Sequence, residues 1–141
     1  MKKILVAVDF SEHSNHALEM AIEIALRFEA SIDLLHVFDL PIPIVNPYEI
    51  AIPPGYIQEA EESAKQKLAE KKSEVEAKGV EVRSHLATAP ISQAIVDAAT
   101  ECGSDLLVVG THGHTGLKHA LLGSVAERIV RHSPCPVLSV K

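Results

Sequence analysis

Short apolar runs alternate along the chain with longer segments in which apolar residues recur every three or four positions. The runs predict strands, and they cover residues 3–8, 32–38, 80–86, 105–110 and 136–140. The helical spacing predicts helices over residues 17–28, 57–78, 90–103 and 124–131. The resulting order, β-α-β-α-β-α-β-α-β over residues 1–141, predicts a single α/β domain with a parallel sheet and helices on both faces.

Residue types at the segment ends support these boundaries. Ser11 or Ser14 is expected to cap the first helix, and Pro90 to open the third at its first turn. Gly79 and Gly103 are placed to end helices. Between the second strand and the second helix, residues 39–56 contain five prolines, which exclude a regular helix or a central strand. A loop of this length is usually functional or mobile.

If the strand order is 3-2-1-4-5, the order reverses between the first and fourth strands. Ligands of open parallel sheets bind beyond the carboxyl ends of the strands at such a reversal. The first strand ends at Asp9, the fourth at Gly110, and the second, ending near Val37, flanks the first. We therefore expect these three strand ends to meet in one crevice.

The stretch "VVGTHGHTGLKHALLGSVAER" (108–128) follows the fourth strand. It contains neither a Walker A loop nor the dinucleotide G-x-G-x-x-G pattern. Glycines nevertheless let a backbone turn sharply and bring its N–H groups close to an anion, and Gly123-Ser124 stands at a helix start, which favours phosphate. The alternative is a plain strand-to-helix connection, with Ser124 and Glu127 forming a capping box. The position opposite Asp9 favours ligand binding.

Two residues of the crevice have both a binding and a structural interpretation. The Asp9 carboxylate can accept hydrogen bonds from a ribose or base, or help to hold a divalent cation; it can also serve as an acidic residue near a helix N-terminus. Val37 can offer main-chain groups to a purine, or only pack in the sheet.

Histidines raise the possibility of a metal site, since His112 and His114 form an H-x-H pair and His119 follows. No cysteine or carboxylate lies nearby in ligand spacing, so we predict no metal ligand from the protein and expect His112 and His114 to donate to phosphate or to face solvent. His13 and His16, one turn apart near a helix start, are expected at the surface. No G-x-S-x-G elbow or nucleophile–base pair is present, so no catalytic residue is predicted.

Composition narrows the class of partner and the compartment. Hydrophobic residues make up 47% of the 141 residues and the formal net charge is -6, which argues against a nucleic-acid partner held by bulk charge. An anionic ligand must then be held by local donors. No signal peptide or transmembrane run is evident, and Cys102 and Cys135 fit reduced thiols, so we expect a cytoplasmic protein without membrane insertion.

Gly110-x-x-Gly113, nine further residues and Gly123-Ser124 match the G-2x-G-9x-G-(S/T) nucleotide motif of the universal stress protein family. The chain resembles the ATP-binding, UspA-like branch along its whole length, including "ILVAVDFSEHS" at the start, "LLHV" in the second strand and "SPCPVLSV" at the end. The resemblance implies the Rossmann-like sheet of order 3-2-1-4-5 shared with adenine nucleotide alpha hydrolases.

The resemblance also implies a binding site for ATP, with Mg²⁺ or Mn²⁺ held through the phosphates. Ala7, Val8 and Asp9 would meet the adenosine, and Val37 the adenine through its backbone. Ribose and phosphates would be surrounded by Val109, Gly110, His112, Gly113, Gly123, Ser124 and Val125. Position 112 is often arginine in relatives, and a neutral histidine would hold phosphate less firmly and with more dependence on pH. Relatives form homodimers through the last strand, here residues 136–140.

These features predict an ATP-binding regulatory protein of the stress response that switches with its nucleotide and signals to an unknown protein partner. A slow ATPase or nucleotide hydrolase is the first alternative, supported by His112 and His114. A non-catalytic structural dimer is the second, and the intact glycine motif argues against it.

Overall fold

The computed structural model describes residues 1–39, 52–113 and 122–141. Their elements alternate as predicted: β1 (Lys3–Ala7), α1 (Glu12–Phe28), β2 (Ser31–Phe38), α2 (Tyr56–Ala77), β3 (Val82–Thr88), α3 (Ile91–Cys102), β4 (Leu106–Gly110), α4 (Ser124–His132) and β5 (Val137–Val140). The strands of the described ranges form one sheet in the order β3-β2-β1-β4-β5, and every neighbouring pair is parallel. The predicted fold class and strand order are confirmed.

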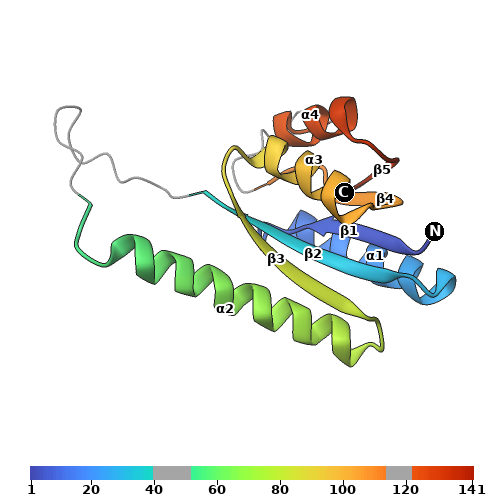
Figure 1. Ribbon diagram of the computed structural model, residues 1–141, viewed down its shortest axis with the longest axis horizontal. Coiled ribbons are helices and arrows are strands. Elements are labelled where there is room, and N and C mark those ends of the chain that lie inside the picture. Colours follow the sequence, from blue (N-terminus) through green and yellow to red (C-terminus); the bar gives the residue numbers. More distant parts are fainter. Residues whose placement is uncertain (40–51, 114–121) are drawn as a thin grey trace.

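The helices cover the sheet in two layers, with α1 and α2 on one face and α3 and α4 on the other (Figure 1). The pleat of β1 divides its side chains between the two cores. Ile4 and Val6 pack with α1, whereas Leu5 packs with α3, and all three are fully buried. A strand buried on both faces explains why residues 3–8 form a continuous apolar run.

The helix ends follow local chemistry. Ser11 is the N-cap of α1, and its Oγ accepts a hydrogen bond from the Ser14 N–H at 3.2 Å. Gly103 ends α3 in the left-handed conformation with φ 62°, and Gly79 follows α2 with φ 84°.

The capping box of Ser124 and Glu127, considered as the alternative for the start of α4, is wrong. Gly123 occupies the N-cap position, Ser124 is the first helical residue, and no side chain caps this helix among the described residues. The boundary of β3 also differs, since it begins at Val82 and runs to Thr88 rather than covering residues 80–86. Its length follows β2, with which it pairs from Ile32↔Val82 to Phe38↔Thr88.

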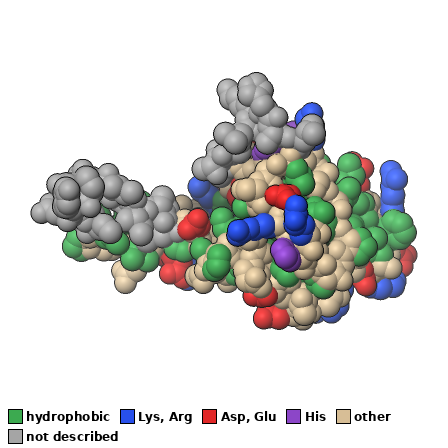
Figure 2. All heavy atoms as spheres, turned by 90° about the horizontal axis from the view of Figure 1, so that it is seen from above, with side chains coloured by type: hydrophobic (Ala, Val, Ile, Leu, Met, Phe, Trp, Pro, Cys, Tyr) green, Lys and Arg blue, Asp and Glu red, His purple; other side chains and the backbone are tan. Residues whose placement is uncertain are grey.

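The outer surface of α4 carries charges of both signs. Glu127 and Arg131, one turn apart and both more than half exposed, form an ion pair at 2.8 Å. Figure 2, seen from the side on which α4 lies, shows basic and acidic side chains standing together on this face. Exposed pairs of this kind contribute little to stability. No helix of the described ranges is long and apolar enough to span a membrane.

Candidate functional site

The carboxyl ends of β1, β2 and β4 border one cavity with a volume of about 980 Å³. It lies where the topology switches: β1 leads into α1 on one face of the sheet, and β4 leads toward α4 on the other. Each residue predicted for the ligand site lines this cavity, namely Ala7, Val8, Asp9, Val37, Val109, Gly110, His112, Gly113, Gly123, Ser124 and Val125. The fold therefore brings together residues from four separate parts of the chain.

Each of Gly110, Gly113 and Gly123 lies too close to a neighbouring part of the chain to carry a side chain without a shift. A Cβ atom on Gly110 would lie 2.9 Å from the His13 carbonyl carbon, and one on Gly123 would lie 2.9 Å from the Thr111 oxygen. A Cβ atom on Gly113 would lie 2.6 Å from Oδ2 of Asp9. None of Gly110, Gly113 and Gly123 has a positive φ, since the glycines with positive φ in the described ranges are residues 55, 79 and 103. The motif instead lets backbone segments and a carboxylate sit against one another.

Asp9 has a structural partner as well as a place in the cavity wall. Its Oδ1 accepts a hydrogen bond from the Ser11 N–H at 2.9 Å, and its own N–H donates to the Ser14 Oγ at 3.3 Å. The carboxylate is thereby fixed just before α1, where the helix dipole favours a negative charge. Oδ2, on the Gly113 side, is the carboxylate oxygen nearest the glycine loop. Both interpretations of Asp9 are thus compatible with one geometry.

His36, on β2, contacts the residues that follow β1 at this side of the cavity. Its Nδ1 lies 2.7 Å from the Val8 oxygen, and its ring lies 4.5 Å from the Phe10 ring, centroid to centroid. Phe10 has φ 63°, a conformation rare for a residue with a Cβ, and it turns the chain from β1 toward α1. Val37, only 8% exposed, presents its strand end beside this contact.

His112 and His13 meet at the edge of the glycine loop. Their ring centroids lie 5.4 Å apart, and His112 Nδ1 lies 3.1 Å from the Thr111 Oγ1. The expectation that His13 faces solvent is wrong, because its backbone packs against Gly110 and the residue is half-buried; His16 is exposed as predicted. His114, expected to donate to phosphate or to face solvent, and His119 lie outside the described residues.

Several residues of the cavity wall have no obvious signal in the sequence. Lys67, from α2, is the one lysine or arginine among the described lining residues, and its Nζ lies 5.8 Å from the centre of the Phe10 ring. The lysines of α2 recur throughout that helix, so periodicity does not single this one out. Phe10, Ser14 and Thr111 also line the cavity. Phe10 and Thr111 are next to predicted residues in the sequence, whereas Ser14 is not.

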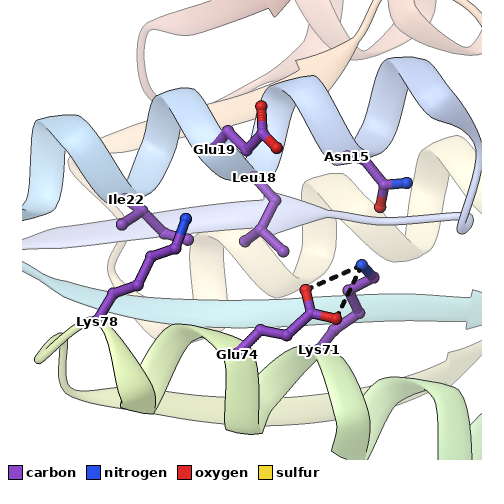
Figure 3. Close-up of a pocket in the computed structure, with 7 residues that line it drawn as sticks. All are labelled: Asn15, Leu18, Glu19, Ile22, Lys71, Glu74 and Lys78. Carbon is purple, nitrogen blue, oxygen red and sulfur yellow. Dashed lines mark hydrogen bonds and ion pairs between the residues drawn. The ribbon is translucent and has the colours of Figure 1, made fainter.

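A second, smaller hollow lies between α1 and α2, with a volume of about 150 Å³ (Figure 3). Its wall carries both signs of charge, and Lys71 donates to both oxygens of Glu74 at 2.9 and 3.2 Å. Leu18 and Ile22 form its apolar floor on the α1 side. Its size and paired charges suit a helix–helix contact better than a nucleotide.

The model of the universal stress protein family matches residues 1–141. The chain belongs to this family. The chain is 35% identical to the universal stress protein MJ0531 of Methanocaldococcus jannaschii, over 99% of this chain and 82% of that protein. Among solved structures, the protein MJ0577 is 35% identical with a TM-score of 0.84, covering 99% of this chain and 95% of its own.

Two further structures of the family hold nucleotides. A universal stress protein in complex with cAMP is 26% identical, with a TM-score of 0.73 and coverage of 99% and 97% of the two chains. The universal stress protein of Archaeoglobus fulgidus in complex with dAMP is 25% identical, with a TM-score of 0.72 and coverage of 100% and 98%.

Proposed function

We propose that this chain binds an adenine nucleotide, ATP in the first place, in the cavity at the ends of β1, β2 and β4, and acts in the cytoplasm as a nucleotide-dependent regulator of the stress response. The observation that carries the proposal is the meeting of all the predicted ligand residues around one cavity of about 980 Å³. Its volume is within the range of small-molecule sites. The nucleotide complexes of the two relatives agree with this choice of ligand.

The phosphates would lie between the glycine loop and the start of α4. The absence of a side-chain cap on α4 in the described ranges supports this, because the first-turn N–H groups of a helix need a partner and an anion can provide one. Lys67 and His112 would add donors from opposite walls. Together these two side chains would provide the local hydrogen-bond donors that an anionic ligand needs, because a chain with a net charge of -6 does not attract an anion by its overall charge. Mg²⁺ or Mn²⁺ would be carried by the phosphates.

The adenosine would occupy the β1–β2 side. Val37 closes this side with an apolar side chain and strand-end backbone, while the nearby Asp9 carboxylate can accept hydrogen bonds from ribose hydroxyls. The Val8 C=O lies 2.7 Å from a His36 ring nitrogen, and the Val8 N–H donates a hydrogen bond to the Leu35 oxygen. Both backbone groups of Val8 therefore already have partners within the protein.

The direct test is the nucleotide content and affinity of the purified chain. We expect adenine nucleotide in an acid extract, or ATP binding in calorimetry with Mg²⁺ after the protein has been stripped. A chain that yields no nucleotide and shows no heat with ATP, ADP, AMP or cAMP would overturn the proposal.

We further propose a homodimer formed by β5, which lies at the edge of the sheet with all four residues partly exposed. The Thr111 N–H donates to the Val140 oxygen and the Leu107 N–H to the Pro136 oxygen, so alternation points the Ser139 N–H away from β4. Ser139→Pro should therefore remove an edge donor and give monomers in light scattering, whereas Ser139→Thr should stay dimeric. Equal masses for both variants would contradict pairing through this edge.

Hydrolysis is a second candidate function, favoured by His112 in the cavity wall, whose ring lies 5.4 Å from the His13 ring. We expect at most weak ATP hydrolysis, and the regulator would then act through a protein partner that distinguishes the bound from the empty loop. Steady phosphate release that is lost in His112→Gln would favour the enzyme instead.

A further inference from the structure

Three potential metal ligands meet on the α3 face of the sheet, away from the nucleotide cavity. Asp33 lies on β2, His85 on β3, and Cys102 is the last residue of α3. One ligand atom from each lies within 4.8 Å of the other two, and His85 Nε2 is 2.7 Å from Asp33 Oδ1. Asp33 precedes Val37 by four residues on the same strand, which places the cluster about 13 Å from that wall of the cavity.

The register of the sheet explains how these residues meet. His85 pairs with Leu35, and its side chain leans along the strand to reach Asp33, which lies two residues before Leu35 on the same face. The C-terminal end of α3 then brings Cys102 over this pair. Nothing in the nucleotide site uses any of the three residues.

We propose that Asp33, His85 and Cys102 form a binding site for a divalent transition-metal ion, with Zn²⁺ as the best fit and water as the fourth ligand. Carboxylate, imidazole and thiolate are zinc ligands, and a set that contains sulfur disfavours Mg²⁺ and Ca²⁺. A tetrahedral zinc site needs ligand atoms about 3.3–3.6 Å apart. The Asp33–His85 contact must therefore open slightly while the thiol approaches, which side-chain rotation can achieve.

Burial and charge at the cluster are consistent with such a site. Asp33 is 8% exposed, while the His85 side chain is 40% exposed, so the cluster has a held carboxylate and an open side for the ion. The C-terminal end of α3 contributes a negative partial charge beside Cys102. Lys3 lies near, but its Nζ donates to the Cys102 main-chain oxygen at 3.1 Å rather than to the thiol.

Cobalt titration of the full chain tests the proposal, since tetrahedral Co²⁺ bound to a thiolate gives a near-ultraviolet charge-transfer band that histidines elsewhere do not produce. We expect this band in the native chain and in Cys135→Ser, which removes the other cysteine. We expect its loss in Cys102→Ser, and at least about tenfold weaker binding in His85→Gln and Asp33→Asn. Absence of the band, or its presence in Cys102→Ser, would overturn the proposal.

Alkylation of the native chain gives a second test that needs no variant. Zn²⁺ should slow the modification of Cys102, measured by peptide mass spectrometry, and leave the rate at Cys135 unchanged. Equal rates at Cys102 with and without Zn²⁺ would contradict the site. The inference does not depend on the nucleotide proposal, and ATP calorimetry on Cys102→Ser should match the native chain.

Discussion

Gly113 lies so close to Asp9 that a Cβ atom at position 113 would meet the Asp9 Oδ2 at 2.6 Å. This contact joins the glycine loop after β4 to the end of β1, across the point where the strand order reverses. A glycine is required there by a neighbouring carboxylate and not by an unusual φ. The end of β1 and the glycine loop, which both border the cavity, can therefore lie in contact because position 113 has no side chain.

Replacement of Gly113 by valine should weaken nucleotide binding without unfolding the chain. The added side chain must displace either the Asp9 carboxylate or the loop, and both border the cavity. We expect at least about tenfold lower affinity for ATP, or ~1.4 kcal/mol, in calorimetry. Ala69→Val, on the exposed surface of α2, is the matched control and should bind as the native chain does. Loss of the folded state in Gly113→Val, seen by circular dichroism, would instead indicate a structural role.

Replacement of His112 by arginine should tighten the binding of ATP. A guanidinium keeps its charge and can donate two hydrogen bonds to phosphate, so a gain of about tenfold is expected. His16→Arg makes the same change at an exposed position of α1 and controls for net charge. If both variants gain equally, the effect is long-range and His112 does not face the phosphates.

Replacement of Ser11 by alanine should destabilise α1 at its start. The Ser14 N–H would lose its 3.2 Å hydrogen bond to the Ser11 Oγ, at a cost of about 1 kcal/mol in the free energy of unfolding. Urea denaturation measures this difference. Ser11→Thr keeps the hydroxyl and should recover most of the loss; an equally unstable threonine variant would assign the effect to packing, since Ser11 is buried.

Asp105 lies just before β4, at the end of the sheet opposite the cavity, and should make the free energy of unfolding depend on pH. Its Oδ2 accepts hydrogen bonds from the Lys2 and Lys3 N–H groups at 2.7 and 3.0 Å, and these lower the pKa of the Asp105 carboxyl in the folded chain. The contribution is therefore present above the unfolded-state pKa of about 3.9 and is lost as the pH falls through the lowered value.

Asp105→Asn should lower the Tm slightly at neutral pH, since the group is exposed and screened by solvent. The difference from the native chain should shrink as the pH falls below about 3.9. Asp97→Asn, on the surface of α3, removes the same charge and should not reproduce the pattern. A constant difference at every pH would show that the Asp105 charge has no part in it.

The alternation of strands and helices, the helix ends at Ser11 and Gly103, and the spacing of Gly110, Gly113 and Gly123 were all accessible from the sequence. Each depends on local chemistry: burial periodicity, capping, or a family motif. The same local logic assigned Ser124 to a capping box, and this was wrong because the N-cap position belongs to Gly123.

Contacts between distant segments were decided by the tertiary structure. Lys67 lines the cavity because α2 packs against β3 and β2, and His13 is half-buried because Gly110 allows α1 to approach β4. Asp33, His85 and Cys102 are far apart in the chain, and only strand order, register and the path of α3 bring them together. Periodicity reports which side of an element is buried, whereas the neighbour on that side depends on how whole elements are arranged in space.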